Sequence, residues 1–323
     1  MAGGVKWVRK VGELEKTSLL TFAISMKHKR LFFAVLLMIS AGLSAQPAMA
    51  VIKNGTFLLG DTVGDADEKP LHWVVINSFM IAKTETTYQD FKTFIDSSGY
   101  LTDAERGDGS FVWDSLGWHK REGVHWRHDE RGRLRVQTRG EYSRYPVLHV
   151  SWNDAAHYCN WISEKAGLDA VYYFEGNKIR VDLSANGYRL PTEAEWEFVA
   201  AGEKSKKSWP HAGIGKLGNI GWYSGNSGHS PKPVGLKQAI LTDIYDLSGN
   251  VWEWSHDWYD ANFYKKSQNA TNPSGPDTGK ERSLRGGSWN NNVAHCRIAN
   301  RTSRFPDFRD GSIGFRVARP ANL

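Results

Sequence analysis

The part of the chain that follows Gly202 constrains the fold most, because it shows almost no regular hydrophobic periodicity. It consists largely of glycine, asparagine and tryptophan with short strand-like runs. The whole chain of 323 residues contains 32 glycines and 14 tryptophans. Backbone polar groups that lack helix or sheet partners must be satisfied by turns, side chains or bound ions. We therefore expect a loop-rich domain in which large aromatic side chains supply much of the core.

Two capping boxes predict helices in the middle of the chain. Ser151 stands three residues before Asp154, and Thr192 stands three residues before Glu195. At this spacing a hydroxyl and a carboxylate satisfy free amide groups at a helix start. Residues 101–145, in contrast, are polar and lack periodicity, so we expect them to form a long ordered surface loop.

Residues 26–50 have the sequence of a secretory signal peptide, with a basic start, a short apolar run and a small-x-small end. We expect cleavage after Ala50. Residues 1–25 precede a complete leader with its own methionine, Met26, and are expected to be a mis-assigned N-terminal extension. Residues 51–323 contain no linker and should form one domain. Because the apolar run is too short to cross a membrane, we expect a periplasmic or secreted protein with no transmembrane anchor.

The formal net charge of +6 resides mainly in the leader. The first 50 residues hold seven of the 41 Lys and Arg residues but only two of the 35 Asp and Glu residues, so 34 basic against 33 acidic residues remain. The basic pI of the whole chain therefore gives little support to nucleic-acid binding, because the excess positive charge belongs mostly to the leader. We therefore expect a peptide, protein or small-molecule ligand and no nucleic acid.

Five motifs follow one another between residues 149 and 317. They are His149-Val-Ser-Trp-Asn-Asp-Ala155, Arg189-Leu-Pro-Thr-Glu-Ala-Glu-Trp-Glu197, Tyr245-Asp-Leu-Ser-Gly-Asn-Val-Trp-Glu-Trp254, Arg285-Gly-Gly-Ser-Trp289 and Gly314-Phe-Arg-Val317. In composition and order they resemble the sulfatase-modifying-factor, or formylglycine-generating-enzyme, family. The resemblance covers nearly all of residues 51–323. It implies an α+β, C-type-lectin-like fold with much irregular structure, two central helices and short strands.

The resemblance implies that active members bind copper(I) through two cysteines after the Gly-Gly-Ser motif and oxidise a sulfatase cysteine to formylglycine. Counted forward from Ser288, those positions are Asn291 and Cys296. Counted backward from Gly314, Cys296 lies outside the pair. Either count leaves one thiol where linear copper(I) ligation needs two, so we expect neither copper nor formylglycine synthesis at this vestigial site.

Cys159 and Cys296 are the chain's two cysteines. Export makes a disulfide between them chemically feasible, because oxidising compartments permit disulfides. Two separate buried thiols are the alternative.

The resemblance also implies two structural calcium sites, because carboxylate, amide and backbone oxygens are the ligands that calcium prefers. The better matched site consists of Asp246, the carbonyls of Gly249 and Val251, and Glu253. The other would use Asn219, the carbonyl of Ile220, Asn226 and the carbonyl of Gly228. The alternative for Asp246 and Glu253 is that they cap turns.

The C-terminal segment 289–313 is the predicted ligand-binding region. Its polar and aromatic side chains resemble the variable region of lectin-fold proteins that retroelements diversify, and a fixed substrate-facing loop is the alternative. The predicted contact residues are Trp289, His295, Arg304, Phe305 and Phe308. A rigid scaffold that presents such side chains is typical of a binding protein.

These patterns predict recognition or accessory maturation of an extracytoplasmic partner. One alternative is a periplasmic, metal-dependent oxidase of the formylglycine-generating or siderophore-maturation type. A second is a retroelement-diversified variable ligand-binding protein. His125 and His128 lie three apart without a third ligand at a suitable spacing, which favours a surface loop over a metal site.

Overall fold

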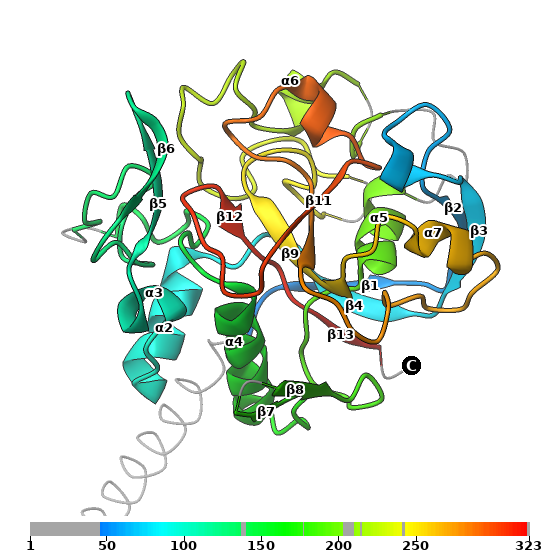
Figure 1. The fold of residues 1–323 in the computed structure, drawn as a ribbon, viewed down its shortest axis with the longest axis horizontal. Helices are drawn as coiled ribbons and strands as arrows, with labels where there is room; N and C mark the ends of the chain where they lie inside the picture. The colour runs from blue at the N-terminus through cyan, green and yellow to red at the C-terminus, as the bar shows by residue number, and fades with distance from the viewer. Residues whose placement is uncertain are drawn as a thin grey trace, which may run out of the picture. The chain divides into compact units, whose positions relative to one another are not determined.

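A mixed four-stranded sheet lies at the centre of the molecule and is built entirely from the irregular C-terminal part of the chain (Figure 1). Its strands are β9 (Trp252–Trp258), β10 (Arg282–Arg285), β11 (Arg301–Arg304) and β12 (Ile313–Gly314), in the order β11-β10-β9-β12. β9 pairs antiparallel with β10 and parallel with β12. The computed structural model describes residues 46–136, 140–176, 178–202, 210–213, 215–240 and 243–321. Residues 1–45, which comprise the expected N-terminal extension and most of the expected leader, lie outside these residues.

A second sheet joins the two ends of the domain. Its strands are β1 (Met49–Ile52), β4 (Phe79–Ala82) and β13 (Ala318–Pro320), with β4 in the middle. The predicted cleavage point falls inside β1, where Met49 pairs with Ala82 and Ala50 pairs with Ile81. Ala50 is buried in the core. The folded domain therefore includes two strand residues that precede Val51, and the cleavage point itself stays a prediction.

Three antiparallel hairpins complete the strands. They are β2 (Gly55–Leu59) with β3 (His72–Ile76), β5 (Ser110–Asp114) with β6 (Gly117–Arg121), and β7 (Tyr172–Glu175) with β8 (Lys178–Val181). The β5–β6 hairpin corrects the prediction of a loop over residues 101–145. Gly117 has a φ of 82° at its turn, and the Trp113 and Trp118 rings lie 5.5 Å apart across the strands. A turn glycine and one aromatic pair are too weak a sequence pattern to predict a strand.

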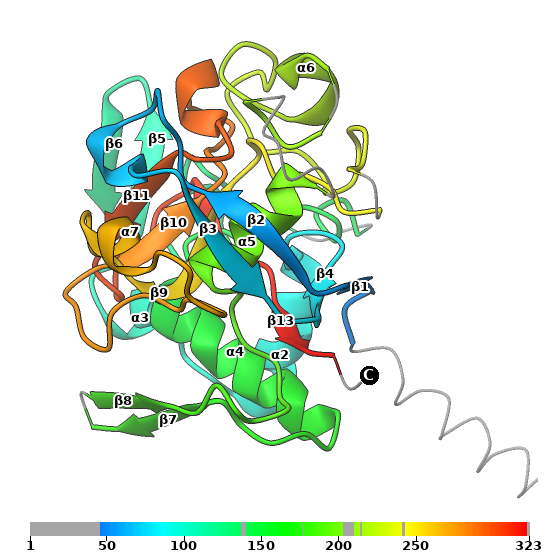
Figure 2. The same ribbon diagram turned by 90° about the vertical axis from the view of Figure 1, so that its right-hand side faces the viewer.

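Both predicted central helices form, as α4 (Trp152–Lys165) and α5 (Glu193–Ala201). Each has its complete capping box, and caps of this kind contribute about 1 kcal/mol each. A third capping box, Thr87 with Asp90, opens α2 (Tyr88–Ser98). α5 contacts the β2–β3 hairpin as well as β9 and β10, so it lies between the hairpin and the central sheet (Figure 2).

The remaining helices are single turns that connect these elements. They are η1 (Ala66–Glu68), α3 (Asp103–Arg106), α6 (Leu217–Ile220), α7 (Phe263–Lys266) and η2 (Val293–Cys296). Among the described residues, none of the helices is both long and apolar enough to cross a membrane. Large aromatic side chains fill the interior, as the sequence predicts. Of the tryptophans that the structure describes, five are fully buried: Trp126, Trp152, Trp196, Trp254 and Trp289.

Buried ion pairs tie α5 to the central sheet. Arg301 on β11 donates from Nε and Nη2 to the two carboxylate oxygens of Glu193, at 2.7 and 2.6 Å. Arg285 on β10 pairs with Glu193 and Glu197. Side chains thus supply fixed hydrogen bonds in a domain where regular backbone ladders are short.

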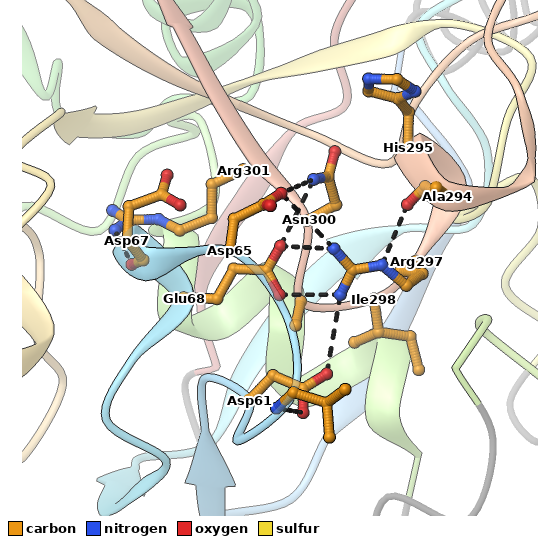
Figure 3. A network of polar contacts seen from close by, with 12 residues as sticks. Asp61, Asp65, Asp67, Glu68, Ala294, His295, Arg297, Ile298, Asn300 and Arg301 are labelled. Atoms are coloured by element: carbon orange, nitrogen blue, oxygen red, sulfur yellow. Dashed lines mark hydrogen bonds and ion pairs between the residues drawn. The ribbon is translucent and has the colours of Figure 1, made fainter.

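A separate ionic cluster holds the segment around η2 against the loop that follows β2. Arg297 donates from Nη1 and Nη2 to the carboxylate of the buried Glu68, at 2.7 and 2.6 Å. Asp61 and Asp65 approach the same guanidinium at 3.6 and 3.7 Å, and Asn300 also donates to Glu68 (Figure 3). The cluster fixes the turn that contains Cys296.

Candidate functional site

A groove of about 330 Å³ opens between the β5–β6 hairpin and the central sheet. Four aromatic residues line it: Phe111 and Trp118 from the hairpin, Trp252 from β9, and Phe308 from the segment after β11. The other lining residues are Leu284, Ser288, Asn290, Asn291, Thr302, Arg304, Asp310, Ser312 and Ile313. Elements far apart in sequence therefore meet at one amphipathic surface.

Ser288 and Asn291 of the vestigial site both lie in this groove. The side-chain oxygen of Asn291 accepts hydrogen bonds from the backbone N–H and the hydroxyl of Ser288, at 3.0 and 2.7 Å. The first of the two positions expected for a thiol is therefore occupied by an amide that its neighbour holds in place.

Cys296 lies outside the groove lining, in agreement with the count backward from Gly314. It is fully buried at the end of η2 and packs with Leu217 and Ile220. Burial raises the pKa of its thiol to about 12. This enclosed thiol is thus separated from the polar groups that line the groove.

The two cysteines do not form the disulfide that the sequence allowed. Both are free and buried. Cys159 lies on α4, and burial raises its thiol pKa well above the usual range, with Arg189 lowering it in part. Cys296 instead contacts the α6 region, and a Cβ on Gly287 would come within 2.8 Å of its sulfur. The structure thus has the alternative arrangement, two separate thiols in different environments.

The Asp246 site has the property expected of a cation site, an unsatisfied buried oxygen. Asp246 is buried in the left-handed region, with φ 62°. Its Oδ2 accepts from the Gly235 N–H at 2.7 Å, whereas its Oδ1 is buried without a hydrogen-bond partner among the described residues. Burial raises the pKa of this carboxyl to about 6. A cation would satisfy the free oxygen and favour the charged form.

Two further buried carboxylates lie beside Asp246. Glu253 accepts from Arg316 Nε and Nη2, both at 2.6 Å, and from Trp196 Nε1 at 2.9 Å. Glu85 accepts from Asn250 Nδ2 at 2.6 Å, and burial raises its pKa well above the usual range, with Asp246 adding to the rise. Among the described residues, Arg316 and Arg144 both lower the pKa of Asp246, and a divalent ion would further balance the three buried carboxylates.

Metal ligation at this site would need backbone oxygens. Within the described ranges, no three His, Cys, Asp or Glu side chains converge as a metal cluster. Gly249 has φ 89°, and a Cβ there would meet the Trp222 carbonyl at 2.1 Å, so the tight turn requires glycine. The carbonyls of Gly249 and Val251 remain the expected partners of Asp246, and calcium there stays a prediction.

At the second predicted calcium site, the side-chain amides are exposed or already hydrogen-bonded within the protein. Asn219 is exposed on α6, the buried Ile220 ends that helix, and Gly228 lies on the loop that follows. The Asn226 amide is engaged within that loop, accepting from the Tyr223 N–H at 2.8 Å and donating to the Gly221 carbonyl at 3.0 Å. The ammonium of Lys237 donates to the Gly218 carbonyl at 2.5 Å. A cation is thus already present beside this loop, and calcium binding here also stays a prediction.

The predicted ligand-binding residues divide into two groups. Arg304 and Phe308 line the groove, and the half-exposed Phe305 lines a smaller adjoining hollow of about 110 Å³. Trp289 is fully buried and donates from Nε1 to the Gly311 carbonyl at 3.0 Å, so its ring supports the groove from inside the core. His295 is exposed on η2 outside the groove, where it bonds to Asn292. Trp289 and His295 therefore lie outside the groove lining, and their role as ligand contacts stays a prediction.

Sequence patterns missed three groove residues that tertiary structure brings together. Phe111 and Trp118 belong to the hairpin that was expected to be a loop. Asp310 is 8% exposed, and its Oδ1 accepts from the Ser312 N–H and hydroxyl at 2.7 and 2.9 Å. Burial raises the pKa of Asp310 to about 6. The sequence signal that could have identified Asp310 was its position two residues before Ser312 within the predicted binding segment.

Comparisons with known proteins agree with this fold. The family model "Sulfatase-modifying factor enzyme 1-like domain" matches residues 38–321. The chain is 32% identical to the formylglycine-generating enzyme of Streptomyces coelicolor, over 84% of this chain and 89% of that protein. It is 29% identical to the inactive Cα-formylglycine-generating enzyme 2 of Mus musculus, over 98% and 96% of the two chains.

Among solved structures, Treponema denticola variable protein 1 superposes with a TM-score of 0.66 at 25% identity, and the match covers 84% of this chain and 95% of that one. Its similarity extends over the same domain as the family model. The α+β fold and the C-type-lectin-like architecture are thereby confirmed. The chain belongs to the sulfatase-modifying-factor, or formylglycine-generating-enzyme-like, family.

Proposed function

We propose that this protein is an exported member of its family that recognises an extracytoplasmic partner, or assists the partner's maturation, without synthesising formylglycine. The observation that carries the proposal is the identity of the groove residues. Neither of the chain's two cysteines lines the groove, and Ser288 and Asn291 bond to each other there. A groove with rigid aromatic walls and polar groups, but no thiolate, suits binding better than copper chemistry.

The rest of the domain supports a binding role, because it holds the groove rigidly. α5, β10 and β11 are joined by buried ion pairs, and the turn after the Gly-Gly-Ser motif is anchored by Arg297 to Glu68. A calcium ion at Asp246 would add to this rigidity, since the free Asp246 oxygen lies next to β9, which contributes Trp252 to the groove. A rigid framework reduces the entropy lost on binding.

Oxygen consumption tests this proposal. The purified protein is incubated with copper(I) and a cysteine-containing sulfatase-motif peptide, and dissolved oxygen and the peptide mass are followed. The formylglycine-generating enzyme of Streptomyces coelicolor provides the positive control under the same conditions. We expect turnover by the control and none by this protein. Oxygen-dependent conversion of the peptide by this protein would instead favour the oxidase alternative.

A variable binding protein is the second candidate, because the chain resembles a Treponema protein whose name describes it as variable. The exposed residues His295, Arg304 and Phe305 could change without disturbing the core, whereas Asp310 and Trp289 are buried and hydrogen-bonded. Sequencing the gene across many clones distinguishes the candidates. Variation confined to codons of exposed residues in segment 289–313 supports diversification, and an invariant segment supports a fixed ligand.

A further inference from the structure

We propose that the groove binds a saccharide, whose hydroxyl groups and apolar ring faces match the two kinds of surface that line it. This inference rests on the proposed binding function and names the class of ligand. It is carried by the arrangement of the groove's aromatic walls, by the donors and acceptors that remain free on its polar residues, and by its balance of charge.

The aromatic residues provide flat apolar surfaces on both sides of the groove. Trp118 on β6 remains 37% exposed at the groove, although it is one of the chain's largest apolar side chains. The Phe111 and Phe308 rings stack on each other, at 5.3 Å between centroids and 24° between planes, and the Arg304 guanidinium lies over Phe308, so these rings form a packed aromatic lining. Such rigid rings bind ligand faces with little loss of side-chain entropy. The C–H face of a sugar ring is a surface of this shape.

Two polar side chains are fixed in place and still have unused hydrogen-bonding groups. Ser312 donates two hydrogen bonds to Oδ1 of Asp310, and the backbone of Ile313 donates to the same carboxylate, which as an ion can accept further hydrogen bonds. Ser288 donates two hydrogen bonds to the side-chain oxygen of Asn291, and no described residue accepts a hydrogen bond from Asn291 Nδ2. The Asp310 carboxylate is an acceptor, and the Nδ2 group of Asn291 is a donor. Both residues line the same groove.

The two opposite charges in the groove favour a neutral ligand. Arg304 and Asp310 are the charged residues in the groove lining, and no ion pair joins them within the described part of the chain. A strongly anionic ligand would be repelled by the Asp310 carboxylate, and a cationic ligand would be repelled by the Arg304 guanidinium. A hydroxyl both donates and accepts, so it can donate to Asp310 and accept from Asn291 or Arg304. A neutral ligand with several hydroxyls can therefore form hydrogen bonds with both charged side chains at once.

The test is calorimetric titration of the full-length purified protein with maltose, cellobiose and N,N′-diacetylchitobiose, together with tryptophan fluorescence. The dipeptide glycyl-phenylalanine and inorganic sulfate are the competing probes. We expect saturable binding of at least one disaccharide. Trp118→Ala and Asp310→Asn should each weaken it by about tenfold or more, as expected for a lost charged hydrogen bond or aromatic contact.

Trp73→Ala is the matched control, because Trp73 on β3 is 46% exposed and lies outside the groove lining. It should leave disaccharide binding unchanged, and Trp118→Ala removes a partly exposed ring, so folding should survive. Binding of the dipeptide or sulfate alone would overturn the saccharide assignment and leave the recognition function standing. Disaccharide binding unaffected by Trp118→Ala, or no disaccharide binding at all, would also overturn it. Oxygen-dependent peptide turnover, measured separately, would overturn the function itself.

Discussion

Arg316 donates hydrogen bonds to both carboxylate oxygens of Glu253, from Nε to Oε2 and from Nη2 to Oε1, each at 2.6 Å. Both side chains are almost completely buried. This pair joins the segment after β12 to β9, directly beside Asp246 and Glu85. Glu253 therefore supports the fold through Arg316 whether or not a metal is bound. Variants at Glu253 would leave a buried guanidinium unpaired and cannot isolate a metal effect.

Asp246 offers the cleaner test of calcium binding. EDTA should lower the Tm of the wild-type protein, because an ion that binds only the folded state contributes about 2.7 kcal/mol at 100 times its Kd. Asp246→Asn should lower the Tm in calcium and abolish the response to EDTA. Differential scanning calorimetry with and without calcium measures both effects. An unchanged wild-type Tm in EDTA would remove the calcium assignment.

The complete β1 strand should stabilise the domain. A protein that begins at Gln46 retains the pairs of Met49 with Ala82 and Ala50 with Ile81, and one that begins at Val51 loses both. We expect the shorter protein to be less stable by about 1–3 kcal/mol, because it loses buried contacts and strand hydrogen bonds. Urea denaturation of the two proteins measures the difference. Equal midpoints would show that these residues contribute nothing to stability.

The ion pair between Arg301 and Glu193 should be essential for stability. Arg301→Met leaves a buried carboxylate with less compensation, which costs about 3–5 kcal/mol when one partner of a buried pair is removed. Arg304 on the same strand is exposed and has no ion pair within the described ranges, so Arg304→Met should change stability by less than about 0.5 kcal/mol. Chemical denaturation compares the two variants. Similar small effects in both would contradict a structural role for the pair.

Asp310 should make stability depend on pH in a defined direction. Burial raises its folded pKa to about 6, above the ~3.9 of an unfolded aspartate. The folded state therefore holds a proton more tightly, and this contribution to stability is full below pH 4 and lost as the pH rises through 6. The stability difference between wild type and Asp310→Asn should shift in favour of the variant over that interval.

Denaturation midpoints between pH 4 and 7 give this comparison, and Asp307→Asn is the control because Asp307 is exposed on the neighbouring turn. The control should follow the wild-type curve. A constant difference between wild type and Asp310→Asn across the range would show that the carboxyl does not titrate in this way.

Features encoded locally could be predicted from the sequence. The capping boxes at Ser151 and Thr192 define the starts of α4 and α5, because each depends on residues three apart. Arg304 and Phe308 of the predicted binding segment both line the groove, and their role as ligand contacts stays a prediction. The five motifs identified the family and its fold because each motif is continuous in sequence.

Features that depend on tertiary contacts could not be predicted in this way. Trp118 becomes a groove residue only because the β5–β6 hairpin lies beside the central sheet. Trp289 has the sequence context of a contact residue, yet its ring is fully buried and bonded to Gly311. The partners of Arg301 and Arg297 are more than one hundred residues away in sequence, so no local pattern could identify those ion pairs.

Copper(I) affinity tests the central claim most directly, because oxidase chemistry in this family depends on a pair of thiolates. The reduced protein competes with a chromophoric copper(I) chelator, and wild type is compared with Cys296→Ser. We predict that wild type removes no copper(I) from the chelator and that the variant behaves identically, since Cys296 is buried away from the groove with a thiol pKa of about 12. One tightly held equivalent of copper(I) in wild type, lost in Cys296→Ser, would contradict the account.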